Sequence, residues 1–262
     1  MNRIWNNFFR TGGVLATAGL LAGCETVDFS RPERVSGPDY EPANVHRLPA
    51  GVPEKIRRVA VLPLVSDARG AQAEAGAETM QSVLVTELVR SGAFEILAVS
   101  ADDLSHATGR GQWTAEEKLP AAFFQKLREQ HGCDAVLFSR LTQYRAYPPL
   151  AVGWSFKLVE CPAKPAGTPR ILWAADEVFD AGNPTVVNSA RRYYLGQLKV
   201  TGPLADSQAM LHTPRRFAQY TLHALALTLP PREFAPQVPP PPADGPSEMK
   251  PKQPAPGAGG SE

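Results

Sequence analysis

The sequence predicts an α/β fold, in which helices pack on a mixed sheet of about five strands to form an α+β sandwich. Three observations predict it. A mostly apolar strand-length run, a helical apolar period and a second apolar run follow one another within residues 57–99, as in a βαβ or split βαβ unit. Three further apolar runs of strand length lie within residues 135–179, and a broadly apolar helix follows. The expected element order is therefore β-α-β-α-β-β-β-α.

The first strand is expected at residues 57–64, where a nearly continuous apolar run is typical of a strand covered on both faces. A helix follows, because apolar side chains recur there at spacings of three or four residues. Gly92 is its expected C-terminal stop, and residues 94–99 are the second strand. The apolar side chains of the helix are Ala73, Ala77, Met80, Leu84 and Leu88.

The next segment is expected to combine a loop with a second helix. Residues 102–111 carry turn residues and are predicted as a loop. Thr114 to Glu117 has the spacing of a capping box, which indicates a helix start, but Pro120 requires a second start if the helix begins so early. The apolar face of the helix lies within residues 123–127, and His131-Gly132 ends it.

Three strands are predicted at Ala135–Tyr144, Val152–Glu160 and Ile171–Phe179. The second alternates apolar and small or polar residues, which is the period-two pattern of a strand with one face exposed to solvent. Turn residues around 147–149 separate the first two strands, so the three should form an antiparallel meander.

The meander places two cysteines near each other. Paired residues of an antiparallel hairpin have a constant index sum, and the midpoint of Cys133 and Cys161 falls at residue 147, in the turn. A disulfide between them is one reading. Two free thiols are the other, because a register slip of one or two residues breaks the match.

The last part of the globular region is less regular. Residues 190–199 are compatible with either a short helix or a strand, after a turn at Asn183-Pro184. Thr213-Pro214 predicts a helix start, with Thr as N-cap and Pro at the first helical position. The helix buries a broad apolar face, and Pro230-Pro231 stops it. One polar strip remains, on which a surface histidine is expected. The strip is Arg216, Gln219 and His223.

The chain divides into four parts. Residues 1–23 resemble a signal peptide, residues 24–54 are expected to be a flexible spacer, residues 55–232 form the α/β domain, and residues 233–262 are a proline-rich tail expected to be disordered. A strand that pairs with the edge of the domain around Val45–Leu48 is the alternative for part of the spacer.

The N-terminus resembles the signal peptide and lipobox of a bacterial lipoprotein. Arg3 and Arg10 precede an apolar run at 14–21 that is far shorter than the ~20 residues of a spanning helix. Ala22-Gly23 then precedes Cys24. The resemblance implies cleavage before Cys24, acylation of its sulfur and its amino group, and stable membrane attachment, with Glu25 in place of Asp favouring the outer membrane. An ordinary secretory signal is the alternative.

Net charge and missing motifs exclude several classes of function. The formal net charge of +1 becomes −1 when residues 1–23, with Arg3 and Arg10, are removed. A near-neutral chain without a basic run argues against nucleic acid as a partner. The five histidines have no metal-ligand spacing, and no nucleophile, phosphate-loop or dinucleotide motif is present. We therefore expect no catalytic residue, no metal site, no cofactor and no enzymatic activity.

The same order of elements resembles the CsgG-like and TolB-N-like domains of periplasmic lipoproteins, a group that includes LpoB. The sequence itself is similar in four segments, which are Arg58–Pro63, Ser91–Leu97, Gly132–Leu137 and Leu172–Ala175. The resemblance implies a Gram-negative outer-membrane lipoprotein that faces the periplasm and serves as a binding or assembly platform for an envelope protein or a peptidoglycan-associated partner. Two alternatives stay open: a subunit of an oligomeric secretion pore and a periplasmic hydrolase. Against the pore, neither face of residues 136–160 is uniformly apolar.

Overall fold

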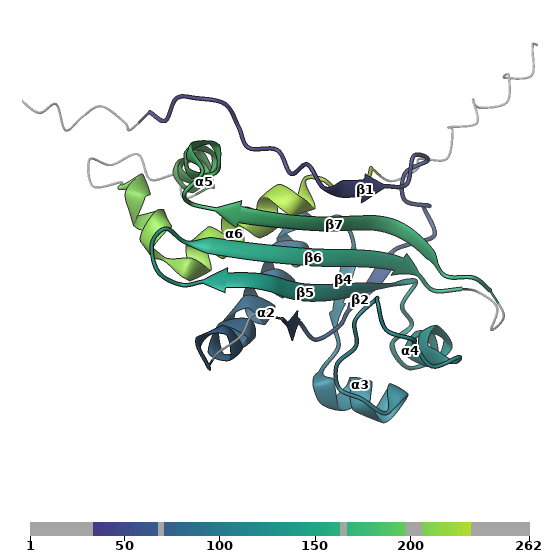
Figure 1. Ribbon diagram of the computed structural model, residues 1–262. Coiled ribbons are helices and arrows are strands. Elements are labelled where there is room, and N and C mark those ends of the chain that lie inside the picture. Colours follow the sequence, from purple (N-terminus) through teal and green to yellow (C-terminus); the bar gives the residue numbers. More distant parts are fainter. Residues whose placement is uncertain (1–33, 68–70, 163–166, 198–205, 232–262) are drawn as a thin grey trace, which may run out of the picture.

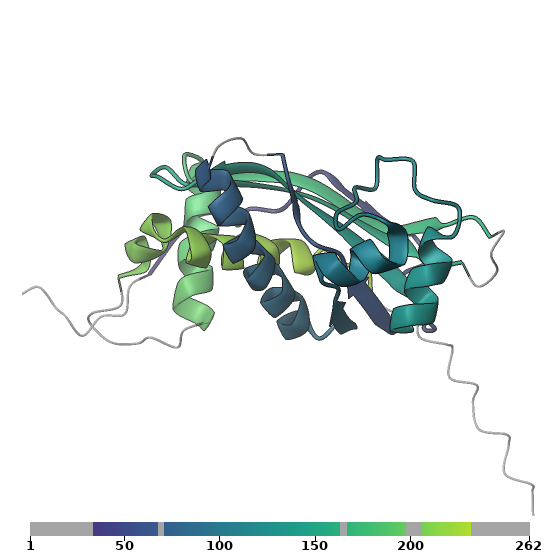
Figure 2. The ribbon, with the colours of Figure 1, turned by 90° about the horizontal axis from the view of Figure 1, so that it is seen from below.

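The computed structural model describes residues 34–67, 71–162, 167–197 and 206–231. A seven-stranded mixed sheet lies at its centre, with helices on both faces (Figure 1, Figure 2). The strand order is β1-β7-β6-β5-β2-β4, and β3 pairs with β5 off this path. The strands are β1 Val45–Arg47, β2 Arg58–Val61, β3 Val65–Ser66, β4 Glu95–Ala98, β5 Ala135–Arg145, β6 Ala151–Glu160 and β7 Arg170–Asp180.

The predicted fold class is confirmed. The five expected strands are β2, β4, β5, β6 and β7, and the short strands β1 and β3 extend the sheet. β2 is parallel to both β4 and β5, as a βαβ unit requires, whereas β5, β6 and β7 form the expected antiparallel meander. The helices are α2 Ala71–Ser91, α3 Ala101–Thr108, α4 Phe123–His131, α5 Pro184–Gln197, the 3-10 helix η1 Ser207–His212 and α6 Pro214–Ala226.

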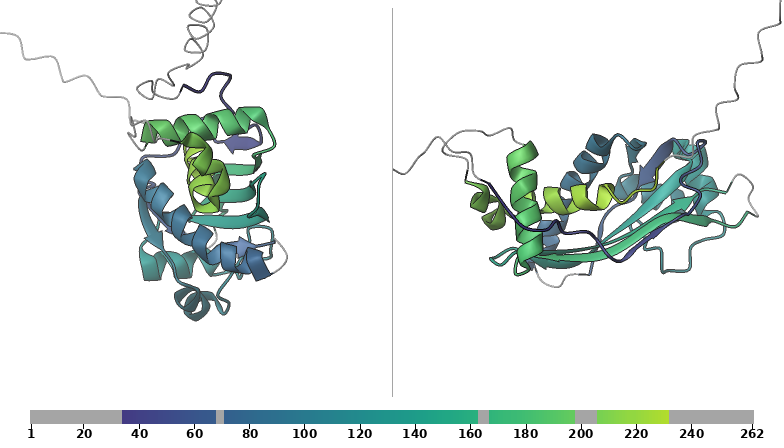
Figure 3. Two further views of the ribbon diagram at one scale, coloured as in Figure 1. Left: turned by 90° about the vertical axis from the view of Figure 1, so that its left-hand side faces the viewer. Right: turned by 90° about the horizontal axis from the view of Figure 1, so that it is seen from above.

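Two apolar cores cover opposite faces of the sheet. The larger core packs α2, α5 and α6 against the face of the sheet that carries Val152, Trp154 and Phe156 (Figure 3). The smaller core packs α3 and α4 against the face that carries Val136 and Phe138. Because side chains alternate along a strand, Leu137 and Phe138 enter different cores. Both faces of β5 and β6 are therefore covered, and the two strands are buried along most of their length. The solvent-exposed face expected for residues 152–160 is thus wrong, because the smaller core covers it.

Two expectations for residues 102–117 are wrong. The predicted loop contains helix α3, in which the Ser100 hydroxyl accepts a hydrogen bond from the Asp103 amide and Gly109 ends the helix at φ 89°. No helix begins at the capping-box sequence Thr114–Glu117, and α4 begins only at Phe123. Pro120 accounts for this, because it prevents a helix from running continuously out of Thr114.

The undecided segment before η1 is a helix. α5 begins at Pro184, directly after Asn183, whose side-chain oxygen accepts a hydrogen bond of 3.0 Å from the Thr185 amide. The Asn-Pro pair, expected as a turn, therefore caps a helix, with Pro at the first helical position.

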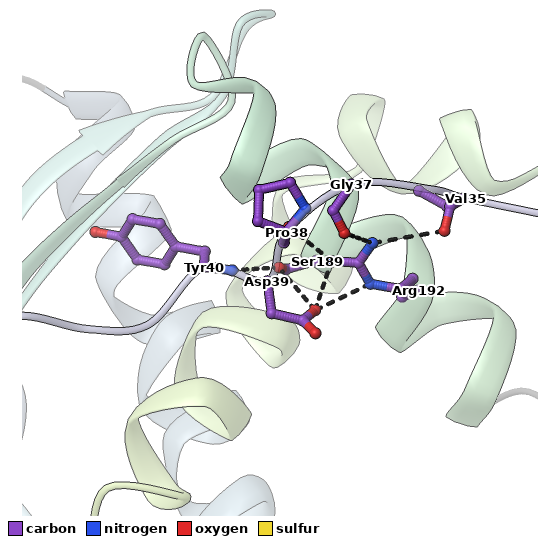
Figure 4. A network of polar contacts seen from close by, with 7 residues as sticks. All are labelled: Val35, Gly37, Pro38, Asp39, Tyr40, Ser189 and Arg192. Carbon is purple, nitrogen blue, oxygen red and sulfur yellow. Dashed lines mark hydrogen bonds and ion pairs between the residues drawn. The ribbon is translucent and has the colours of Figure 1, made fainter.

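Part of the expected spacer packs on the domain. Residues 35–48, which we name the strap, run along α5 and β7 and include β1, so the alternative of an edge strand is confirmed. On α5, the Arg192 guanidinium donates to the carbonyls of Gly37 and Pro38 at 3.0 and 2.8 Å and forms an ion pair with Asp39 (Figure 4). On β7, Glu177 accepts hydrogen bonds from the Tyr40 hydroxyl and the Ala43 amide. The strap is thus held at two points.

Helix α6 is fixed on the sheet by two tryptophans. The Trp154 indole donates to the Thr221 hydroxyl at 2.9 Å, and the Trp173 indole donates to the Thr228 hydroxyl at 3.0 Å. Just beyond, the Val52 amide donates to the Pro231 carbonyl at 3.0 Å. The C-terminal end of α6 therefore has a defined position. Within the described ranges, no helix is both long enough and apolar enough to span a membrane.

Candidate functional site

Two adjoining hollows open on the face of the sheet that carries the larger core, where α2, α5 and α6 meet. The larger one, of about 720 Å³, lies between the C-terminal ends of α2 and α6, and we name it the apolar groove. The smaller one, of about 270 Å³, lies between α5, η1 and α6, and we name it the cationic hollow. Arg90 and Gln197 line both, so the two hollows form one continuous surface. We take this surface as the candidate site.

The packing of α2 sets the position of Glu87 and Arg90. Met80, Val83 and Leu84 are buried in the larger core, so the last turns of α2 are held against α6. Glu87 is only 3% exposed, and its carboxylate accepts from the Arg90 guanidinium at 2.7 Å. Burial raises the pKa of Glu87, while the neighbouring Arg90 opposes that shift. Arg90 itself keeps half of its side chain exposed, toward the two hollows.

Tyr193 and His223 form the wall between α5 and α6. Their rings lie 4.9 Å apart between centroids. Burial, followed by the charge of Arg90, lowers the pKa of His223, so that the imidazole is neutral at neutral pH. Burial, followed by the charge of Glu87, raises the pKa of the Tyr193 phenol. The wall is therefore aromatic and uncharged, beside a guanidinium.

Arg216 supplies the second cation of the hollow. It lies in the first turn of α6, and its guanidinium donates to the Tyr194 hydroxyl at 3.2 Å and sits 5.4 Å from the centre of that ring. Arg216 pairs with no carboxylate among the residues that the structure describes. Gln197 and Gln219 add two side-chain amides to the same lining.

Apolar side chains, one of them largely exposed to solvent, form the rim of the apolar groove. Leu227 is 73% exposed, an unusually high value for a leucine in this fold. Phe94, Leu229, Pro230 and Pro231 line the groove beside it. An exposed apolar rim next to polar groups is typical of an interaction surface.

The arrangement is suited to binding. Two guanidiniums and two amides offer directional donors, and the adjoining apolar groove offers area for burial. Within the described ranges, no group of three or more His, Cys, Asp or Glu side chains could hold a metal ion. The Glu87 carboxylate accepts from Arg90, and the His223 ring contacts the Tyr193 ring at a tilt of 40°.

The two described cysteines singled out from the sequence lie outside this site. Cys24, the predicted lipidation site, falls outside the described residues. Cys133 and Cys161 flank the β5–β6 hairpin as expected, and both are buried in the smaller core as free thiols with their sulfurs 3.9 Å apart. A hydrogen bond from Cys161 lowers the pKa of the Cys133 thiol. The disulfide itself stays a prediction.

Sequence reasoning found one edge of the site without recognising it. Arg216, Gln219 and His223 were expected as a solvated strip, but Arg216 and Gln219 line the cationic hollow and His223 lines the apolar groove. His223 is half-buried. The polar strip was a usable signal for the site, because polar side chains on an otherwise apolar helix must face either bulk water or a cavity.

No family model matches the sequence, and no curated protein matches it. Among solved structures, the chain is similar to a subunit of the PelC dodecamer from Paraburkholderia phytofirmans, with 12% identity and a TM-score of 0.37 over 70% of this chain and 94% of that chain. It is also similar to the lipoprotein GNA1162 from Neisseria meningitidis, with 16% identity and a TM-score of 0.32 over 55% of this chain and 96% of that chain. A third similarity is to the hypothetical protein CT253 from Chlamydia trachomatis, with 10% identity, a TM-score of 0.36, and coverage of 65% and 93%. At these TM-scores the similarities carry no statement about partners or activity.

Proposed function

We propose that this chain is a lipid-anchored protein on the periplasmic side of the Gram-negative outer membrane, whose α/β domain binds another envelope component at the apolar groove and cationic hollow. The role is that of a binding or assembly platform and is not enzymatic. The observation that carries the proposal is the continuity of an exposed apolar rim with an ionic, amide-lined hollow. The lipobox-like sequence that ends at Cys24 supports the anchor.

The apolar groove and the cationic hollow contribute differently to the binding of a partner. Removal of apolar surface from water contributes about 25 cal/mol per Å², from which the entropic and desolvation costs of association are subtracted, and a guanidinium fixes orientation through directional hydrogen bonds. The groove is held by α2 and α6, which pack on the sheet, so a partner meets a preformed surface.

Photo-crosslinking from the rim tests this function. A benzoylphenylalanine at Leu227 should give one discrete crosslinked product in living cells, whereas the same residue at Val178 should not. Val178 is the matched control, because it is an exposed apolar residue on β7. Leu227→Asp should abolish recovery of that product's partner by co-purification, and Val178→Asp should not. Equal products from both positions, or none from Leu227, would contradict the proposed site.

The anchor is tested separately. Cells labelled with a clickable palmitate analogue should yield labelled protein in the outer-membrane fraction, and Cys24→Ala should remove both the label and the membrane association. Unlabelled wild-type protein in the soluble fraction would mean that residues 1–23 are an ordinary secretory signal.

The alternatives predict different outcomes. A pore subunit should be recovered as rings in detergent extracts, and a monomeric extract would exclude it. A hydrolase requires a convergent acid, base and nucleophile, and Asp or His substitutions that abolish turnover of an envelope polymer would favour it.

A further inference from the structure

The cationic hollow carries a positive charge, on Arg216, that no carboxylate of the described residues neutralises. Arg90 is paired with the buried Glu87 carboxylate, whereas Arg216 donates to the Tyr194 phenol and, within the described ranges, to no carboxylate. A guanidinium carries five N–H donors, so donors of Arg216 are left for a ligand. Apart from Arg90, the other groups that line the hollow are uncharged amides, phenols and a thioether: Gln197, Gln219, Tyr193, Tyr194 and Met210.

The dimensions restrict what can enter. A volume of about 270 Å³ accepts one side chain or one small group, and the neighbouring apolar groove of about 720 Å³ accepts several more. Arg90 and Gln197 border both, so one extended ligand can place a polar group in the first and apolar groups in the second. Arginine pairs with planar carboxylates in a bidentate manner, which a lysine could not reproduce.

We propose that the cationic hollow binds a carboxylate of an extended polypeptide segment, with Arg216 as the main contact, while adjacent apolar side chains of that segment occupy the apolar groove. This inference rests on the proposed function and names the chemistry of the partner. Leu227, Leu229 and Phe94 favour a polypeptide over an acidic glycan, because aliphatic surface contributes most when it buries other apolar surface.

Two short peptides provide the probe. Leu-Glu-Leu-Leu-amide, with rhodamine attached to its N-terminal amine, and its Gln counterpart differ only in one carboxylate, and their binding to the full-length protein in detergent is followed by anisotropy at low ionic strength. The Glu peptide should bind at least about tenfold more tightly than the Gln peptide, because a hydrogen bond to a charged group usually changes affinity by that factor or more. Arg216→Gln should abolish that difference without weakening the Gln peptide. Arg216→Lys should restore only part of it.

Arg215 provides the matched control. It is the neighbouring arginine in the first turn of α6, it is exposed, and it does not line the hollow. Arg215→Gln should leave the Glu peptide's affinity unchanged. Equal binding of the two peptides, or equal effects of the two substitutions, would overturn the inference.

Failure of the inference is distinguishable from failure of the proposed function. If the Leu227 crosslink forms but Arg216→Gln does not weaken it, the groove binds a partner and the carboxylate assignment is wrong. If an oligoglucuronate competes with the Glu peptide and binds more tightly than it, the ligand is an acidic glycan and the polypeptide assignment is wrong.

Discussion

Glu87 illustrates how burial at one residue makes stability depend on pH. Because burial raises the pKa of Glu87, the native protein holds this proton more tightly than the unfolded chain does. The corresponding stabilisation is present below the unfolded-state pKa and is lost as pH rises through the raised folded-state pKa. In Glu87→Gln this contribution is absent.

We therefore expect Glu87→Gln to gain stability relative to wild type as pH rises from 4 to 7. The free energy of unfolding, measured by urea titration at several pH values, gives the difference. Glu78→Gln, an exposed position on the same helix, should show no such trend. A constant difference across the pH range would mean that the Arg90 ion pair cancels the effect of burial, and a trend of the opposite sign would mean that the ion pair outweighs it.

The cysteine pair gives the second prediction at this scale. In an oxidising compartment, the Cys133 thiolate is expected to attack the disulfide of an oxidoreductase, and Cys161 then displaces that enzyme's thiol to close the bond. Protein isolated without reductant and then unfolded in denaturant should resist alkylation at both cysteines and be two hydrogens lighter than the reduced form. Reduction should lower stability by about 2–4 kcal/mol. Cys161→Ser, in which no intramolecular bond can form, should be insensitive to reductant. Alkylation without reductant would contradict the bond.

The pattern of residue types predicted which side chains are buried better than it predicted which groups a side chain contacts. The alternation of Val152, Trp154 and Phe156 predicted one buried face, and all three lie in the larger core. The polar strip with His223 was assigned to solvent, because the sequence cannot show that Tyr193 of another helix covers it. A pattern reports the polarity of a face and not what lies opposite.

At the scale of elements, strands were easier to predict than short helices. β2, β5, β6 and β7 carry long apolar runs, and their pairing follows from chain order and turns. α3 has only eight residues, two of them buried apolar, so its period is too short to stand out. β1 has three residues and owes its existence to β7, which offers an unpaired edge.

The strap supplies a prediction at this scale. Tyr40 donates its amide hydrogen to the Ser189 hydroxyl, and Ala43 donates to Glu177, so both amides should be protected from exchange. The double variant Arg192→Ala, Glu177→Gln should speed the exchange of these amides by roughly tenfold to a hundredfold. This range corresponds to the free energy that hydrogen bonds to charged groups usually contribute. Hydrogen exchange measured by mass spectrometry over residues 35–48 is the readout. Glu41→Gln, which alters an exposed acid of the strap, should leave it unchanged. Unchanged exchange in the double variant would show that β1 alone holds the strap.

At the scale of the molecule, the candidate site joins residues that are far apart in the chain. Arg90, Gln197 and Arg216 come from three helices, and only the packing of α2, α5 and α6 on one face brings them together. The order of elements predicted that packing in outline. The two hollows depend on where helices end, which is the property that sequence patterns define least well.

The strap also fixes where the N-terminal segment leaves the domain. Eleven peptide units separate Cys24 from Val35, whose carbonyl accepts from Arg192, so an anchored domain can lie at most about 40 Å from the lipid-bearing residue. Release of the strap as far as Val45 would lengthen the tether to 21 units and its limit to about 75 Å.

Neutron reflectometry on a supported bilayer that carries the lipidated protein measures this tether. The gap between the headgroups and the protein layer should widen by about 1.4-fold in the Arg192→Ala, Glu177→Gln double variant, because the mean span of a flexible tether grows as the square root of its length. Glu41→Gln should leave the gap unchanged. An unchanged gap in the double variant, with exchange of residues 35–48 accelerated, would show that residues 24–34 and not the strap determine the standoff. A widened gap would establish that Arg192 and Glu177 set how closely the domain, and with it the groove, is held to the membrane.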